Sequence, residues 1–455
     1  MSRVDDVRRP VGDGDEASFE DVVERLDDDA VRRLLEAAAV GHDDVARAVR
    51  LAAATDVDRL GVLRTEVDRG LRTRRYLGYR ESSEWACDAE PVVDALTAAV
   101  VSSPSRELVE LVQRATGHVV KVILRADDSD GMIGGLAQQL VDLHAQACDA
   151  GVADPVRLAR WMAKFTFEDQ DFFVVDPVRY AAALGERGLT AYRQEVTKRS
   201  AAAGDQFAPR YATERLAILD GDVDRVVELL GGDLSAPYQF IRVTEAMLEL
   251  DRSDDALAWA RRGIAETSGW QVGKLYDFAA DVLADRDERT EVLGLRREQH
   301  ERMPSSSTYA VLQAAATEVD GWEEERAAAR SVLAASDRGG LVDALLADCD
   351  TDQAWAVATS GEWDPGDQRW QRLAEVREPT DPIAAMAVYL RLANGALLTA
   401  DRRAYRVAIR HLKAARRAAS TADRTDEFAD HVRVLREQHR RRPSLIEMLD
   451  KAGLR

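Results

Sequence analysis

The sequence predicts an all-α fold: a tetratricopeptide-like helical repeat (an α-solenoid) preceded by an N-terminal helical domain. Three observations lead to this prediction. The composition is rich in Ala, Leu, Val, Arg, Asp and Glu, and only 6% of residues are aromatic, which favours helices over sheets. Apolar residues recur at helical spacing along most of the 455 residues. Asp-rich turns recur at similar intervals in the second half of the chain.

The chain is expected to have three parts. Residues 1–17 show no periodic apolar pattern and include Pro10, Gly12 and Gly14, which predicts a flexible acidic arm. Residues 18–200 are predicted to form the N-terminal helical domain, because the periodicity is lost between Ser200 and Pro209. The tetratricopeptide-like array is predicted over residues 210–455.

Helices of the N-terminal domain are predicted in order from their apolar stripes and start signals. The stripes cover residues 26–38, 45–52, 60–71, 108–123 and 158–165. Ser103-Pro104 and Asp154-Pro155 precede the last two stripes, and each places a capping side chain before a proline suited to the first helical position.

The second half of the chain repeats a helix-turn-helix pattern. The acids that mark the five turns are 31, 34, 35 and 30 residues apart, and they are Asp220, Asp251, Asp285, Asp320 and Asp350. This spacing is close to the repeat of about 34 residues in tetratricopeptide proteins. The strict consensus of that repeat is not matched, so the units are described as tetratricopeptide-like.

Each predicted unit has two apolar stripes that need a partner. In one unit, Ile241, Met247 and Leu250 line the first helix, while the second helix carries Ala256, Trp259, Ala260 and Ile264. Neither helix can bury its stripe alone, so the sequence predicts that neighbouring units stack.

Composition limits the classes of function. The 62 Lys and Arg against 82 Asp and Glu give a net charge of −20, which repels phosphate backbones and makes a nucleic-acid partner unlikely. Neither a membrane-spanning stretch nor a secretory signal is recognised. The three cysteines (Cys87, Cys148 and Cys349) are too far apart in sequence for a disulfide framework or a Cys-only zinc site. We therefore expect a cytoplasmic protein with no membrane partner.

The sequence contains none of the standard catalytic motifs that were compared with it. The nearest approach to a phosphate loop, residues 269–274, is one residue short, and Leu275 stands where a hydroxyl is needed. We therefore expect a protein that is not an enzyme, has no catalytic residues and needs no cofactor.

A basic stripe is the main candidate for binding a partner. Residues 402–442 contain thirteen bases and five acids, a local charge of +8 that leaves −28 on the rest of the chain. Five of these bases, spaced 3, 4, 3 and 4 residues apart, share one helix face, opposite an apolar stripe; they are Arg403, Arg406, Arg410, Lys413 and Arg417. We expect this face to dock an acidic protein partner. The alternatives are a solvated outer face, ion pairs with a neighbouring helix, or contact with nucleic acid through residues 402–442.

A metal site is the alternative from another class. His144 and Cys148 lie four residues apart, on one helix face, and the Asp-rich turn at Asp127–Gly131 could bring His118 back toward them. Calcium binding by this turn fails on spacing, because Ala126 and Ala137 occupy ligand positions. The competing interpretation is that the turn caps a helix and that Cys148 packs in the core.

Three segments carry a resemblance to a known family. They run from Asp127 to Cys148 (with Leu140, Leu143-His144 and Ala147-Cys148), from Tyr180 to Arg193 (with Leu184-Gly185, Gly188-Leu189 and Ala191-Tyr192), and from Leu435 to Leu449 (with His439, Pro443 and Leu445). These segments resemble the helical region that follows the zinc finger in bacterial and archaeal SWIM zinc-finger proteins. The family's Cys-x-Cys … Cys-x-His zinc motif is absent, so zinc-finger function is not carried over. The resemblance implies a helical interaction module, which agrees with a non-enzymatic scaffold for protein–protein interactions.

Overall fold

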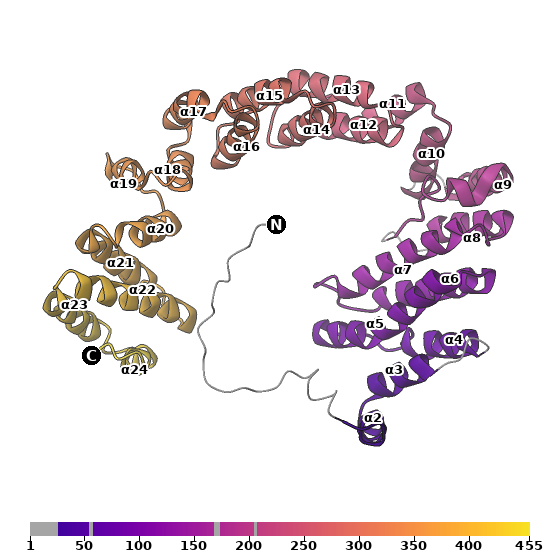
Figure 1. The fold of residues 1–455 in the computed structure, drawn as a ribbon, viewed down its shortest axis with the longest axis horizontal. Helices are drawn as coiled ribbons and strands as arrows, with labels where there is room; N and C mark the ends of the chain where they lie inside the picture. Colours follow the sequence, from indigo (N-terminus) through magenta and orange to yellow (C-terminus); the bar gives the residue numbers. More distant parts are fainter. Residues whose placement is uncertain (1–25, 54–57, 168–172, 204–206) are drawn as a thin grey trace, which may run out of the picture. The chain divides into compact units, whose positions relative to one another are not determined.

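The computed structural model describes residues 26–53, 58–167, 173–203 and 207–455 (Figure 1). Over these ranges the chain forms 23 helices and no strand, which confirms the predicted all-α class. Two extended segments meet there in a single parallel bridge between Leu77 and Ala126. The predicted arm over residues 1–17 lies outside the described residues. None of the described helices is long and apolar enough to cross a membrane.

The chain divides into two compact units, residues 1–229 and 230–455. The predicted boundary between residues 200 and 210 lies before this division and stays a prediction. The helices up to the division are α2 (Asp28–Gly41), α3 (Asp43–Ala53), α4 (Arg59–Gly70), α5 (Tyr79–Ser102), α6 (Arg106–Ile123), α7 (Met132–Asp149), α8 (Pro155–Phe167), α9 (Ala181–Ala203), α10 (Phe207–Leu219) and α11 (Val223–Gly231).

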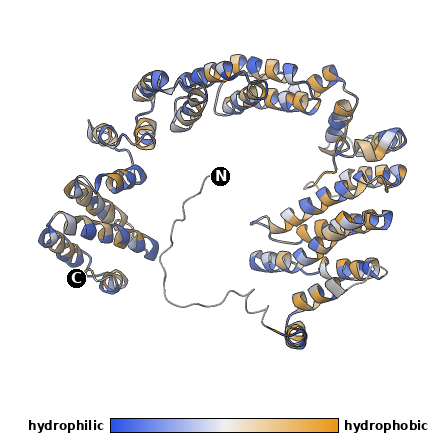
Figure 2. Ribbon diagram, in the orientation of Figure 1, coloured by the Kyte–Doolittle hydropathy of each residue, from blue (hydrophilic) through white to orange (hydrophobic). Residues whose placement is uncertain are grey.

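The core of the first unit is built from the apolar stripes of successive helices. Val92 of α5, Val112 of α6 and Ile133 and Leu140 of α7 are fully buried in one cluster. Substantial helix interfaces in this unit join immediate neighbours or second neighbours, for example α5 with α7 and α4 with α6. Figure 2 shows the hydrophobic and hydrophilic residues sharing each helix, as expected for helices buried on one side.

Of the two helices predicted to begin at a proline, the structure confirms one start and moves the other. Helix α8 begins at Pro155, and the Asp154 carboxylate accepts a hydrogen bond from the Arg157 amide at 2.9 Å, so this start is confirmed. Helix α6 begins at Arg106, and Ser105 rather than Ser103 caps it by accepting from the Leu108 amide at 3.2 Å. The predicted start was two residues early, because a second serine follows Pro104 and has the extended backbone of a cap.

The second unit continues as helix pairs joined by short turns. Its helices are α12 (Pro237–Glu249), α13 (Ser253–Glu266), α14 (Val272–Asp285), α15 (Arg289–Arg302), α16 (Ser306–Thr317), α17 (Trp322–Ser336), α18 (Arg338–Ala347), α19 (Thr351–Thr359), α20 (Asp367–Arg377), α21 (Pro382–Ala396), α22 (Arg402–Thr421), α23 (Thr425–Gln438) and α24 (Pro443–Lys451). Here too, substantial interfaces join only neighbours and second neighbours. That these pairs form a tetratricopeptide-like solenoid stays a prediction.

The two stripes of the unit formed by α12 and α13 are mostly buried. Ile241, Met247, Ala256, Ala260 and Ile264 lie in the interior. The other two stripe residues, Leu250 and Trp259, are only half-buried. Leu250 is the C-cap residue of α12, and the Trp259 ring packs against Phe240 with the Arg262 guanidinium over both rings.

The predicted Asp-rich turns share one backbone geometry. Each contains a residue in the left-handed region: Gly221, Asp251, Asp287, Asp320 and Cys349, with φ between 57° and 64°. The amide after it reaches back to a carbonyl five residues earlier, as Arg252 does to Met247 at 2.9 Å and Gly321 to Ala316 at 2.8 Å. This helix-ending pattern satisfies carbonyls that the helix leaves free. Asp tolerates the left-handed region better than most residues, which accounts for the Asp at three of these five positions.

Buried polar side chains tie three successive helices together in the second unit. The His300 ring of α15 is within 3.0 Å of the Thr308 hydroxyl of α16 and of the Ala329 carbonyl oxygen of α17. The Asp348 carboxylate, 5% exposed, accepts from the Tyr309 hydroxyl at 2.5 Å and from the Arg330 guanidinium at 2.8 Å. Asp348, which precedes the left-handed Cys349 in its turn, therefore links that turn to α16 and α17.

The left-handed backbone of the Asp-rich turns can be tested by substitution at Asp320, an exposed residue with a φ of 57°. Asp320→Gly should stabilise the second unit by about 0.5–1 kcal/mol, since glycine adopts a positive φ without a Cβ penalty. Asp320→Val should destabilise it by more than about 1 kcal/mol, because a β-branched residue is strained there. Urea denaturation followed by circular dichroism measures both. Equal stability of the two variants would contradict the proposed role of this turn.

Candidate functional site

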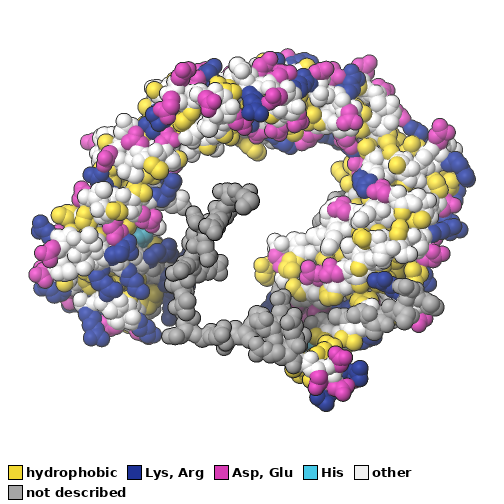
Figure 3. Space-filling model, in the orientation of Figure 1, with side chains coloured by type: hydrophobic (Ala, Val, Ile, Leu, Met, Phe, Trp, Pro, Cys, Tyr) yellow, Lys and Arg dark blue, Asp and Glu magenta, His cyan; other side chains and the backbone are white. Residues whose placement is uncertain are grey.

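The basic stripe lies on helix α22 and faces outward. Arg403, Arg406, Arg410, Lys413 and Arg417 are all exposed. The opposite face is buried through Tyr405, Ala408, Ile409, Leu412, Ala415 and Ala419. Asp401 caps the start of the helix by accepting from the Ala404 amide at 2.8 Å. In Figure 3, Lys and Arg side chains gather over the C-terminal helices at the lower left.

Arg417 differs from the other four bases because it already has an acidic partner. Its guanidinium donates from two nitrogens to both carboxylate oxygens of Glu378, each at 2.7 Å. Glu378 follows α20 and is 13% exposed, and Arg417 holds its pKa below the usual range. The Tyr389 hydroxyl donates to the same carboxylate at 3.0 Å. Arg417 therefore ties α22 to the end of α20, which leaves four bases for a partner.

The four remaining bases have no ion-pair partner in the part of the chain that the structure describes. Arg406 makes one contact, from Nε to the Arg402 carbonyl oxygen at 3.3 Å, which leaves its other donors open. Arg403 to Lys413 cover about 15 Å along the helix at 1.5 Å per residue. This row presents positive charge and hydrogen-bond donors toward solvent.

The structure does not bring the three candidate metal ligands together. Among the described residues, no three His, Cys, Asp or Glu side chains form a group that could hold a metal ion. His118 of α6 is hydrogen-bonded through Nε2 to the Asp68 carboxylate of α4, at 3.0 Å. His144 and Cys148 of α7 lie near each other, with 3.8 Å between His144 Nε2 and Cys148 Sγ, but both are fully buried.

Hydrogen bonds occupy both ring nitrogens of His144. The Tyr180 hydroxyl lies 3.2 Å from the Val141 carbonyl oxygen, to which it donates, and 2.7 Å from His144 Nδ1. We therefore assign the ring proton to Nδ1, so that Nε2 accepts from the Gln113 amide at 3.1 Å. Burial lowers the pKa of His144 to about 3 and raises that of the Cys148 thiol to about 12. A neutral, fully bonded imidazole beside a protonated thiol is a core arrangement.

The Asp127–Gly131 turn caps helix α7. Both oxygens of Asp128 accept backbone amides at 2.8 Å, one from Ile133 and the other from Gly134. Gly131 adopts a φ of 75° just before the helix. Ser83 of α5 donates to Asp130 at 2.5 Å and so links the turn to a neighbouring helix. The acids of this turn therefore have partners within the first unit.

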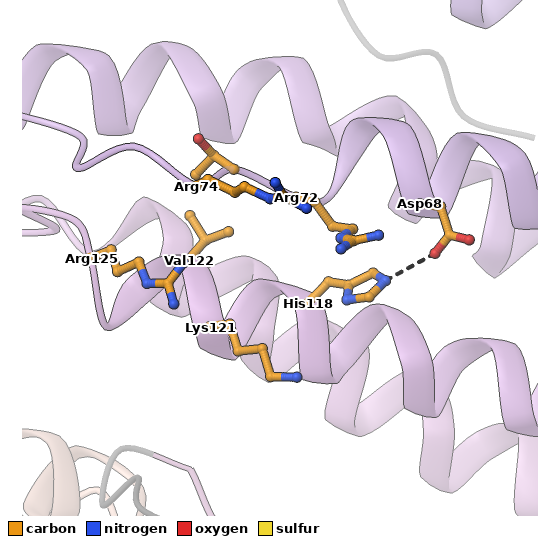
Figure 4. Close-up of a pocket in the computed structure, with 8 residues that line it drawn as sticks. Asp68, Arg72, Arg74, His118, Lys121, Val122 and Arg125 are labelled. Atoms are coloured by element: carbon orange, nitrogen blue, oxygen red, sulfur yellow. Dashed lines mark hydrogen bonds and ion pairs between the residues drawn. The ribbon is translucent and has the colours of Figure 1, made fainter.

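The first unit has a basic pocket that was not predicted from the sequence (Figure 4). It has a volume of about 420 Å³ and is lined by Asp68, Arg72, Thr73, Arg74, His118, Lys121, Val122 and Arg125. One feature of the sequence could have indicated a basic site here, because four of the seven residues from Arg69 to Arg75 are arginines. Their convergence with Lys121 and Arg125, about fifty residues later, depends on how α4 and α6 pack.

Comparison with known proteins gives no family for this chain. No protein-family model matches it, and a search of curated proteins finds no match. The resemblance to SWIM-associated helical regions therefore stays a prediction.

Charge reversal should distinguish the structural role of Arg417 from that of the other bases on α22. Arg417→Glu should destabilise the second unit by about 1–2 kcal/mol, because it places a second carboxylate against one that is largely buried. Lys413→Glu, a matched change one turn earlier, should alter stability by less than about 0.5 kcal/mol. Urea denaturation checks both. Similar effects of the two changes would show that Arg417 is no more structural than its neighbours.

The buried His144 predicts a pH dependence of stability. Its pKa is lowered in the folded chain, so the unfolded chain binds more protons between about pH 6.5 and pH 3. Its contribution to stability is therefore complete above pH 6.5 and is lost as the pH falls toward 3. His144→Gln should be less stable than the wild type at pH 7, and the difference should shrink at pH 5. Melting temperatures measured across this range test the prediction, and parallel profiles would contradict it.

Proposed function

We propose that the protein is a non-enzymatic scaffold that docks an acidic protein segment on the outer face of α22. The observation that carries this proposal is the row formed by Arg403, Arg406, Arg410 and Lys413. All four are exposed, and none has an ion-pair partner among the described residues. Elsewhere in the described residues many basic side chains pair with an acid, as Arg261 does with Glu291 and Arg297 with Glu325.

The chemistry of the row favours carboxylates as its target. Three of the four bases are arginines, whose planar guanidinium binds carboxylates through two parallel hydrogen bonds. The contact between Arg417 and Glu378 is an internal example of this geometry on the same helix. The chain outside residues 402–442 has a net charge of −28. This charge repels a long phosphate backbone, which would extend beyond the basic segment, more than it repels a short acidic segment that contacts only the row.

The helical pairs of the second unit support the scaffold role. Their apolar stripes face neighbouring helices, and substantial interfaces reach no further than the second neighbour. In this proposal they form a tetratricopeptide-like stack, which presents surfaces to partners rather than enclosing a reaction centre. The helical interaction module implied by the SWIM resemblance fits the same role.

Reversing the charge of the row tests docking directly. The test variant carries Arg403→Glu, Arg406→Glu, Arg410→Glu and Lys413→Glu. It should bind a fluorescent oligoglutamate peptide of about ten residues at least tenfold more weakly than the wild type at low salt, because four favourable charge contacts become repulsive. Fluorescence polarisation measures the affinity, and the melting temperature checks that the fold survives.

A matched control separates position from net charge. Arg424, Arg433, Arg440 and Arg441 are also exposed and lie on or next to α23. Reversing these four bases changes the net charge by the same amount. If control and test variants weaken binding equally, the effect comes from net charge and not from the row on α22. If a single-stranded oligonucleotide binds the wild type more tightly than the peptide does, the partner class is wrong.

A further inference from the structure

The walls of the basic pocket are held in place by buried leucines and backbone hydrogen bonds. Arg72, Thr73 and Arg74 lie between Leu71 and Leu77, both fully buried. The Leu77 amide donates to the Arg125 carbonyl oxygen at 2.9 Å, and the Asp127 amide donates to the Leu77 carbonyl oxygen at 2.9 Å. The segment after α4 is therefore tied to the end of α6, which fixes two groups of bases opposite each other.

The pocket concentrates positive charge that the described part of the chain does not neutralise. Figure 4 shows Arg72 and Arg74 on one side of the pocket and Lys121 and Arg125 on the other. All four are exposed, and none has an ion-pair partner among the described residues. Like charges that line one pocket repel one another, so a multivalent anion bound among them would remove an unfavourable interaction.

The one acid of the lining is already occupied. Asp68 accepts two hydrogen bonds from Arg114, at 2.6 and 2.8 Å, and a third from His118 at 3.0 Å. The bond to Arg114 is the main reason why the pKa of Asp68 is lowered to about 2. His118 is 14% exposed, and burial lowers its pKa, so it adds little charge of its own. The positive charge of the pocket therefore comes from four side chains, those of Arg72, Arg74, Lys121 and Arg125.

We propose that this pocket binds a small molecule that carries two or more phosphate groups. Guanidinium groups on both walls can each bind phosphate oxygens in pairs, and the Lys121 ammonium adds a point charge on the same wall as Arg125. The volume of about 420 Å³ lies in the range of small-molecule sites. Because bases line both walls, a ligand with two or more anionic groups can contact more of them than a single phosphate can.

Inorganic pyrophosphate is the probe for this proposal. Isothermal titration calorimetry of the full chain should show one site, with an affinity that falls steeply as salt is added. Arg72→Gln combined with Arg125→Gln, which removes one base from each wall, should weaken binding at least tenfold. The melting temperature of this variant should stay close to that of the wild type, since neither side chain has an ion-pair partner in the described residues.

The control replaces two nearby arginines that do not line the pocket. Arg75 and Arg80 lie in the same stretch of chain and pair with Glu81 and Glu84. Arg75→Gln combined with Arg80→Gln lowers the net charge equally and should leave pyrophosphate binding unchanged. As a local readout, the His118 ring signals in NMR spectra should shift on titration with pyrophosphate.

Three results would overturn the proposal. The first is the absence of pyrophosphate binding to the folded wild type at low salt. The second is equal weakening by the pocket and control variants, which would indicate general electrostatic attraction. The third is equal affinity for inorganic phosphate and pyrophosphate, which would show that the two walls do not act together.

Discussion

The structure depends on one constraint: the helices have apolar stripes that only a neighbouring helix can cover. Among the described helices α2 is an exception, because none of its residues is buried. Short amphipathic helices gain most of their stability from packing rather than from intrinsic propensity. In this chain the cover comes from the next helix or the one after it. From residue 220 onward the Asp-rich turns help to make this possible, because the left-handed residue in each one ends a helix and lets the chain fold back at once.

Much of the fold could be predicted from local patterns in the sequence. The apolar stripes gave the all-α class, and the Asp-rich turns marked the points at which the chain reverses. The contacts of Asp348 with Tyr309 and Arg330 were not predictable, since only the packing of the helices brings these residues together. Leu250 and Trp259 were expected in the interior and are half-buried instead, because periodicity defines a face but not how far a neighbour covers it.

In the candidate sites too, residue spacing predicts which side chains share a helix face, but not which side chains the tertiary packing brings together. Spacing alone placed the bases of α22 on one exposed face, since the opposite face was apolar over the same length. It could not show that Arg417 pairs with Glu378, which lies 39 residues earlier. Spacing also placed His144 and Cys148 together, but burial decides their chemistry and makes them core residues. The basic pocket needed two segments that only the packing of α4 against α6 brings together.

The short reach of the helix contacts has a consequence for how the chain folds. When contacting segments are close in sequence, little loop entropy is lost as each contact forms, and folding is fast for the size of the chain. Such a chain also opens in segments, because losing a terminal helix removes the contacts of only one or two others. At the C-terminal end, α24 has its substantial interface with α22. Hydrogen exchange should therefore be fastest at this end of the second unit and should slow toward its middle helices.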